Sequence, residues 1–242
     1  MPSPLPAQPS GARRLRLVLE YDGGRFCGFQ RQPGQRSVQG ELEAGLSALC
    51  GHPVATVGAG RTDAGVHALG QVVHFDTTGR IPVERIARAL NTALAPELVV
   101  RHVEETETSF HARYHAVSRS YSYFIMRRQP SPFQARYTLY EPALREDAAP
   151  RIESAARPLL GRHDFQVFST GGLHGRSPER TVLRAGVVAE GDLLRIDLTA
   201  DSFLRSMVRV IVGLLLEVGR GRRSPESVRQ VLRKQEELGA AT

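Results

Sequence analysis

Two apolar periodicities follow one another near the start of this chain and restrict its fold most strongly. Residues 15–21 alternate between apolar and mainly polar side chains, which is typical of a strand with one buried face. Residues 38–49 carry Val and Leu at helical spacing after Ser37, and serine is a favoured residue at a helix N-cap. The N-terminal region therefore predicts a half-buried strand followed by an amphipathic helix.

The next segments complete one set of elements. Short strands are predicted near residues 53–58 and 71–76, and a second helix is predicted to start at Pro82, because proline is well accommodated in the first turn of a helix. A strand near residues 97–103 follows. The predicted order of the first half is therefore β-α-β-β-α-β.

A similar order then begins again. The predicted segments are a strand near 118–127, a helix near 147–160 ending at Gly161, strands near 181–189 and 192–199, a helix from about 202 to 218, and a last helix starting at Ser224–Pro225. The Gly191–Asp192 step predicts a tight hairpin between the two strands. The second half thus reads β-α-β-β-α, with a helix where the closing strand is expected.

This order predicts an α+β protein with two pseudo-symmetric split-βαβ halves, each like an RNA-recognition sheet. The N-terminal half is predicted at residues 13–115 and the C-terminal half at residues 116–242. Residues 1–12, which are rich in Pro and Ser, are predicted to form a disordered tail.

The charge of the chain favours a polyanionic partner. The formal net charge is +7 and the pI is near 10.1, so nucleic acid is the first candidate. Lys234 is the single lysine among 32 basic residues. Arginine codons of a GC-rich genome explain this bias, and arginine also suits bidentate phosphate contact.

Several classes of protein receive no support from the sequence. Cys27 and Cys50 form neither a disulfide framework nor a paired metal-binding spacing, which fits a reducing cytoplasm. His111 and His115 lack the intervening glutamate of the zinc-protease pattern. The apolar run at residues 208–216 is too short to span a bilayer. We therefore expect a cytoplasmic protein with no metal site and no membrane segment.

The stretch from Gly58 to His67 is the most informative for chemistry. It reads GAGRTDAGVH, so small residues surround Arg61 and Asp63. Small residues allow sharp backbone turns and close approach to a ligand. A simple turn capped by aspartate is the structural alternative, but Arg, Thr and Asp together form a costly cluster for a turn alone.

This stretch closely resembles the signature GRTDAGVH of the tRNA pseudouridine synthase A family. The resemblance extends from Leu15 to about Thr242. Its further blocks are Tyr21–Gly23, Phe26–Gln32, Ser37–Gln39, Gln71–Phe75, Phe110–Arg113, Arg119–Tyr123, and Phe203–Arg209 with Gly213. The resemblance implies an isomerase that converts uridine to pseudouridine at positions 38, 39 and 40 of the tRNA anticodon stem-loop. It also implies a homodimer, and two halves that share an extended antiparallel sheet with helices on one side and a central active-site cleft.

The family motif assigns Asp63 as the catalytic carboxylate, and a carboxylate suits a reaction that needs a nucleophile or charge stabiliser. Three roles remain open at this stage: attack at C1′, attack at C6, and assistance to glycal formation. The reaction oxidises nothing and releases nothing, so no cofactor is expected. A buried carboxyl group needs a nearby cation to stay ionised. The resemblance points to Arg209 as that cation, with Arg205 in reserve.

Tyr121 matches the position where the family stacks an aromatic ring on the target base; a core tyrosine is the structural alternative. The target uridine must leave its stack, and Arg61 is expected to hold the flipped nucleotide or fill the vacated space. The loop at residues 22–36 mixes Arg25, Arg31 and Arg36 with two phenylalanines, a composition that suits RNA contact.

Two other functions were weighed against this one. A non-catalytic RNA-binding module gives no reason for an aspartate in a small-residue loop, where its charge opposes RNA. A metal-dependent nuclease needs clustered carboxylates, and Asp63 has no acidic neighbour within ten residues. The resemblance further implies that the chain lacks a final apolar strand after Thr242, which predicts an exposed sheet edge.

Overall fold

The computed structural model describes residues 11–172, 175 and 177–240, and it divides into two compact units that meet in sequence between Ala116 and Val117. The tail predicted at residues 1–12 lies mostly outside the described residues. The principal elements of the first unit are β1 (Arg13–Tyr21), α1 (Val38–Cys50), β2 (Thr56–Gly58), β3 (Ala68–Thr77), α2 (Val83–Leu94) and β4 (Leu98–Thr106). Their order agrees with the predicted β-α-β-β-α-β.

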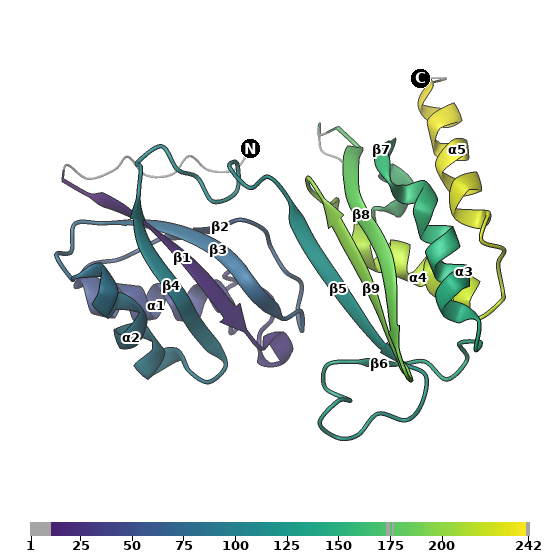
Figure 1. Ribbon diagram of the computed structural model, residues 1–242. Coiled ribbons are helices and arrows are strands. Elements are labelled where there is room, and N and C mark those ends of the chain that lie inside the picture. The colour runs from purple at the N-terminus through teal and green to yellow at the C-terminus, as the bar shows by residue number, and fades with distance from the viewer. Residues whose placement is uncertain (1–10, 173–174, 176, 241–242) are drawn as a thin grey trace. The chain divides into compact units, whose positions relative to one another are not determined.

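The first sheet has the strand order β2-β3-β1-β4, and its strand pairs are antiparallel. Both helices pack on one face of it (Figure 1). The predicted alternation is confirmed, since Leu15, Leu17 and Leu19 are completely buried against α1 and α2. The predicted N-cap is also confirmed, because Ser37 Oγ accepts the backbone N–H of Gly40 at 3.2 Å.

A polar layer lies on the other face of β1 and β3. The Arg14 guanidinium makes two 2.7 Å hydrogen bonds to the Asp76 carboxylate and also donates to the carbonyl of Phe110. His74, which is 2% exposed, accepts the N–H of Ala112 at 3.1 Å. These bonds hold the segment after β4 against the strands.

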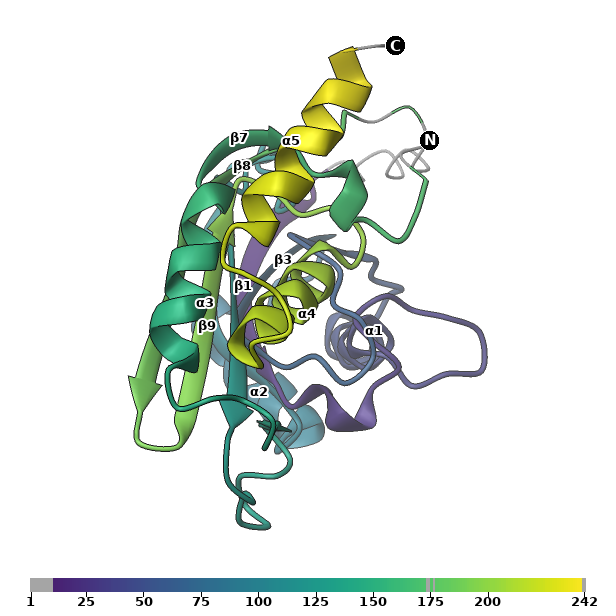
Figure 2. The ribbon, with the colours of Figure 1, turned by 90° about the vertical axis from the view of Figure 1, so that its right-hand side faces the viewer.

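The second unit contains β5 (Arg119–Met126), β6 (Leu139–Tyr140), α3 (Ala148–Ala156), β7 (Gly161–Asp164), β8 (Glu179–Glu190), β9 (Leu193–Ala200), α4 (Met207–Gly219) and α5 (Ser227–Ala240). The sheet order is β6-β5-β9-β8-β7. Figure 2 shows α3, α4 and α5 on one face of this sheet. The predicted hairpin is confirmed, because Gly191, with φ +59°, and Asp192 connect β8 to β9.

Four details of the second unit differ from the sequence prediction. The short strands β6 and β7 were not predicted, and β6 pairs with β5 in parallel. The helix predicted at 147–160 ends as an α-helix at Ala156 and tightens to a 3-10 turn, since Pro158 has no N–H to continue the ladder. The helix predicted from 202 starts only at Met207, because Ser206 adopts a left-handed φ of +60°. The last helix starts at Ser227, three residues later than predicted.

The expected single sheet shared by both halves is also not what the described strands form. They make two separate hydrogen-bonded sheets of four and five strands, one in each unit. The coarser prediction of an α+β protein with helices covering sheets is confirmed.

Candidate active site

The GAGRTDAGVH stretch forms the end of β2 and the loop that leads to β3. The start of this loop is hydrogen-bonded to β3. Ala59 N–H donates to the carbonyl of Val72 at 2.8 Å, and Gln71 Nε2 donates to the carbonyl of Gly60 at the same distance. Sheet hydrogen bonds therefore continue into the loop that carries Asp63.

Asp63 lies at the turn of this loop. The backbone N–H of Val66 donates to its carbonyl at 3.2 Å, and Gly65 has a φ of +77°, a left-handed conformation that glycine adopts without a steric penalty. The side chains of Asp63 and Arg61 are both exposed. The first unit therefore presents one carboxylate and one guanidinium, two residues apart, on a folded loop that a large substrate can reach.

The segment from Asp22 to Phe29 packs directly beneath the loop. Phe29 N–H donates to the carbonyl of Thr62 at 3.0 Å, and Gly65 N–H donates to the carbonyl of Phe26 at 3.4 Å. A Cβ atom built on Gly23 would lie 2.1 Å from the carbonyl oxygen of Val66. The two backbones are thus in contact, which explains why small residues occur in both segments.

The arginines expected to contact RNA from the 22–36 loop all have carboxylate partners. Arg25 lies 2.8 Å and Arg36 2.5 Å from Glu97, and Arg36 also lies 4.7 Å from the Phe26 ring centre. The guanidinium of Arg31 lies 3.4 Å from Glu43. Arg25 and Arg31 remain 68% and 71% exposed, so their outer faces are accessible. A cavity of about 540 Å³ lies beside Arg31 and Arg36.

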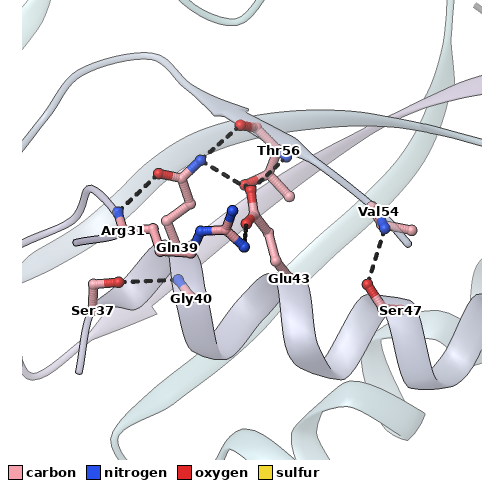
Figure 3. Close-up of polar contacts among 8 residues, drawn as sticks. All are labelled: Arg31, Ser37, Gln39, Gly40, Glu43, Ser47, Val54 and Thr56. Carbon is pink, nitrogen blue, oxygen red and sulfur yellow. Dashed lines mark hydrogen bonds and ion pairs between the residues drawn. The ribbon is translucent and has the colours of Figure 1, made fainter. Parts of the chain in front are cut away.

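Glu43 organises this region from within α1 (Figure 3). Its carboxylate is 7% exposed and accepts the N–H of Thr56 at 2.8 Å and the Thr56 hydroxyl at 3.1 Å. Gln39 Nε2 donates to the same oxygen at 3.0 Å, and Gln39 Oε1 accepts the N–H of Arg31. The network connects α1 to the start of β2 and to the loop at residues 22–36. Sequence reasoning had not identified it, because Glu43 resembles an ordinary helix residue.

Tyr121 lies in the second unit, on β5, opposite Leu198 of β9. Its ring meets Phe203 edge-on, with ring centres 5.2 Å apart and planes at 84°. The ring is half-buried, whereas Ile125 on the same face is completely buried. Tyr121 therefore stands at the border of the core, with Phe203 supporting its edge.

Arg209 is an exposed residue in the first turn of α4. The helix predicted from about residue 202 would have included Arg205, the reserve candidate, but the observed helix does not. Arg205 precedes the left-handed Ser206 and lies outside the helix, where its carbonyl accepts the N–H of Thr170 at 3.3 Å. Arg209 therefore projects from the first turn of α4, whereas Arg205 belongs to the loop that precedes this helix.

The segment between β5 and β6, residues 127–138, is a feature that sequence reasoning missed. Together with β6 it carries three arginines and no acidic residue. Phe133 is 88% exposed and Tyr137 is 51% exposed. Hydrogen bonds from Gln134 N and Ala135 N to the Ser131 carbonyl close a turn within it. Interleaved arginine and aromatic residues were the signal that could have identified it.

Among the described residues, no group of three or more His, Cys, Asp or Glu side chains is placed to hold a metal ion. No described helix is both long enough and apolar enough to cross a bilayer.

The first unit thus presents an exposed carboxylate and an exposed guanidinium on a glycine-rich loop, built on a sheet with helices on one face. Residues 17–115 and 155–241 match the family described as tRNA pseudouridine synthase. The chain belongs to this family of isomerases that act on tRNA.

Individual relatives are similar in sequence to this chain over most of the length of both proteins. The tRNA pseudouridine synthase A of Brevibacillus brevis is 43% identical over 222 residues, which is 91% of this chain and 90% of the relative. The protein of the same name from Chromobacterium violaceum is 43% identical over 230 residues, covering 94% and 87%. That of Geobacillus kaustophilus is 40% identical over 222 residues, covering 91% and 85%.

Proposed function

We propose that this protein isomerises uridine to pseudouridine in the anticodon stem-loop of tRNA, at positions 38, 39 and 40, with Asp63 as the catalytic carboxylate. The placement of Asp63 carries this proposal: it is exposed at the turn of a loop whose start is hydrogen-bonded to β3 and whose middle is hydrogen-bonded to Phe26 and Phe29. The rearrangement breaks the N1–C1′ bond, forms a C5–C1′ bond, moves a proton off C5 and leaves N1 protonated. The uracil keeps all its heavy atoms, and no redox cofactor is needed.

The remaining residues have supporting roles in this proposal. Arg61 holds the flipped nucleotide or fills the space that it leaves, and Tyr121 stacks on the target base with its edge supported by Phe203. Arg209 supplies positive charge for the Asp63 carboxylate, and Arg205 contacts RNA. A pseudo-symmetric pair of halves and a central active-site cleft, both implied by the family resemblance, are part of the same proposal.

The tRNA backbone is proposed to contact two basic regions. One is the 22–36 loop with Arg25, Arg31 and Arg36, whose glutamate partners reduce its net charge. The other is the 127–138 segment, where Arg128 is 82% exposed although it lies 3.4 Å from Asp192, and where Phe133 is also exposed. Stacking on such rings and phosphate contact by arginine are how loops of RNA are held.

The assembly and location follow from the family resemblance. We propose a homodimer that binds tRNA and works in the cytoplasm without a metal. The rival, a non-catalytic RNA-binding module, predicts tRNA binding without any change to the base.

One experiment decides between the two functions. The protein is incubated with an unmodified tRNA transcript that carries uridines 38, 39 and 40, and pseudouridine is then mapped site by site. We expect modification at those uridines and none with Asp63→Asn. A transcript that is bound but remains unmodified would support the RNA-binding module instead.

A further inference from the structure

Tyr21, the last residue of β1, and Asp22, which follows it, contact the catalytic loop on both sides of Asp63. The Tyr21 hydroxyl lies 2.9 Å from Thr62 Oγ1, and Thr62 immediately precedes Asp63. The Asp22 carboxylate oxygen Oδ1 lies 3.0 Å from Nδ1 of His67, four residues after Asp63. Tyr21 and Asp22 therefore contact the residues on the two sides of Asp63, Thr62 before it and His67 after it.

We propose that Tyr21 and Asp22 are positioning residues for Asp63, acting through Thr62 and His67. This inference rests on the proposed catalytic role of Asp63. In this proposal the Asp63 carboxylate is oriented by these two residues as well as by the backbone of its own loop.

The Thr62 contact is anchored in a buried residue of a central strand of the unit. β1 lies between β3 and β4 in the sheet, and Tyr21 is only 3% exposed within the core. The carbonyl of Thr62 is held as well, by the N–H of Phe29 at 3.0 Å. Thr62 is thus fixed through both its side chain and its backbone, immediately before Asp63.

The turn after β1 offers two partners to one ring nitrogen of His67. Nδ1 accepts the N–H of Gly23 at 3.1 Å when the ring proton is on Nε2, and it donates to Asp22 when it carries the proton itself. The N–H of Gly24 donates to Asp22 Oδ1 at 2.9 Å. The imidazole and the carboxylate are therefore both held by the turn that follows β1. Gly23 is buried, and its backbone approaches Val66 so closely that a side chain would not fit.

An exposed carboxylate on a loop containing Gly60 and Gly65 needs such contacts, because glycine backbone has many accessible conformations. Catalytic groups must be held close to their productive geometry, and a misplacement of about 1 Å can cost about 100-fold in rate. The alternative is that the Tyr21 hydroxyl bond only satisfies a buried polar group. Removal of that bond would then lower stability without a specific effect on the chemical step.

The test measures the single-turnover rate constant at saturating tRNA, together with tRNA affinity and the melting temperature. Tyr21→Phe removes one oxygen atom, and Thr62→Val removes its partner while keeping the shape of the side chain. We expect each variant to react about tenfold more slowly, with a tRNA Kd within about twofold of wild type, since a small displacement of a catalytic group lowers the rate of chemistry first. Thr62→Ser keeps the hydroxyl and should restore most of the rate.

The double variant Tyr21→Phe with Thr62→Val tests whether the two residues act through the same hydrogen bond. If both residues act through one bond, the double variant should react no more slowly than the slower single variant. The matched control is Tyr123→Phe, which removes the hydroxyl of a half-buried tyrosine in the core of the second unit. For the other contact, His67→Ala should slow the reaction more than His67→Asn, whose amide oxygen can still accept the Gly23 N–H.

Rates like wild type in both Tyr21→Phe and Thr62→Val would overturn the proposal, as would rate losses that multiply in the double variant. A lower melting temperature at an unchanged rate would assign the bond to stability alone. The activity of Asp63→Asn distinguishes a wrong positioning role from a wrong catalytic role for Asp63. In the first case Asp63→Asn is inactive while the positioning variants are fully active, and in the second case Asp63→Asn is itself active.

Discussion

The hydroxyl of Tyr21 lies 2.9 Å from Oγ1 of Thr62, which connects a core residue of the central strand β1 to the residue that precedes Asp63. The same strand contributes Leu15, Leu17 and Leu19 to the centre of the core. The geometry of the catalytic loop is consequently coupled to the packing of the first unit.

The first prediction concerns Asp63→Asn, which keeps the size of the side chain and removes its charge. We expect pseudouridine formation to fall by at least 100-fold, equivalent to about 3 kcal/mol of barrier stabilisation, with tRNA affinity within a few-fold of wild type. Rates from a defined transcript and a binding titration measure both quantities. Residual activity above a percent or so would contradict the catalytic assignment.

The second prediction compares the two basic regions. Binding should weaken with salt at a log–log slope of about −0.7 to −0.9 for each phosphate contact. Arg128→Gln combined with Arg136→Gln should flatten the slope by more than one contact. Arg25→Gln combined with Arg31→Gln should flatten it to a similar extent, because Arg25 and Arg31 are 68% and 71% exposed although Glu97 and Glu43 lie against them, and Arg128 likewise lies 3.4 Å from Asp192.

The salt-dependence measurement needs a control variant outside both basic regions. Arg157→Gln changes an exposed arginine in the 3-10 turn after α3 and should leave the salt dependence unchanged. If the pair in the 127–138 segment behaves like this control, tRNA does not contact that segment.

The third prediction separates Arg209 from Arg205. Arg209→Leu should lower the single-turnover rate at least tenfold, because a positive charge beside the carboxylate stabilises its ionised form. Arg205→Leu should mainly weaken tRNA binding, since Arg205 lies outside α4. The two variants are compared in the same rate and binding assays. If Arg205→Leu lowers the rate and Arg209→Leu mainly weakens binding, Arg205 supplies the charge for Asp63 and Arg209 does not.

The fourth prediction concerns stability in acid. Burial lowers the pKa of His74 to about 4, and the positive charge of Arg14 acts in the same direction. The unfolded chain binds a proton at its ordinary value near 6.5, so this contribution to stability is present above that pH. It is lost as the pH falls towards 4.

Between pH 7 and pH 5 the loss from His74 should amount to about 1–2 kcal/mol, after allowance for solvent screening. His74→Gln retains an acceptor for the Ala112 N–H and should lose less stability over that interval. Urea unfolding at the two pH values measures the difference. Equal losses in wild type and His74→Gln would show that His74 is not kept neutral by its environment.

The fifth prediction concerns the Glu43 network. Glu43→Ala leaves the N–H of Thr56 without its acceptor at a buried position, which should cost about 2 kcal/mol of unfolding free energy. Glu41→Ala, two residues earlier at a half-buried position on the same helix, is the control and should cost less than 1 kcal/mol. Equal effects in denaturant unfolding would argue against a special role for Glu43.

The sequence alone predicted the elements whose periodicity is long and regular. The alternation at residues 15–21, the Ser37 cap and the Gly191–Asp192 hairpin each depend on neighbouring residues only, so local patterns sufficed to predict them. The motif around Asp63 likewise identified the family without any coordinates. Short strands such as Leu139–Tyr140 were missed, because two residues carry no periodicity.

Only the tertiary structure revealed the long-range contacts. Nothing in the local pattern of Glu43 indicates that it bonds to Thr56, nor that Glu97 lies against Arg25 and Arg36. The helix predicted from residue 202 started late because of the left-handed Ser206, which helix periodicity cannot indicate. The sequence by itself determined the family motif around Asp63 and the principal elements, because these depend on neighbouring residues. Contacts such as Tyr21 with Thr62 depend on how distant segments pack, so only the folded chain decided how the carboxylate is held.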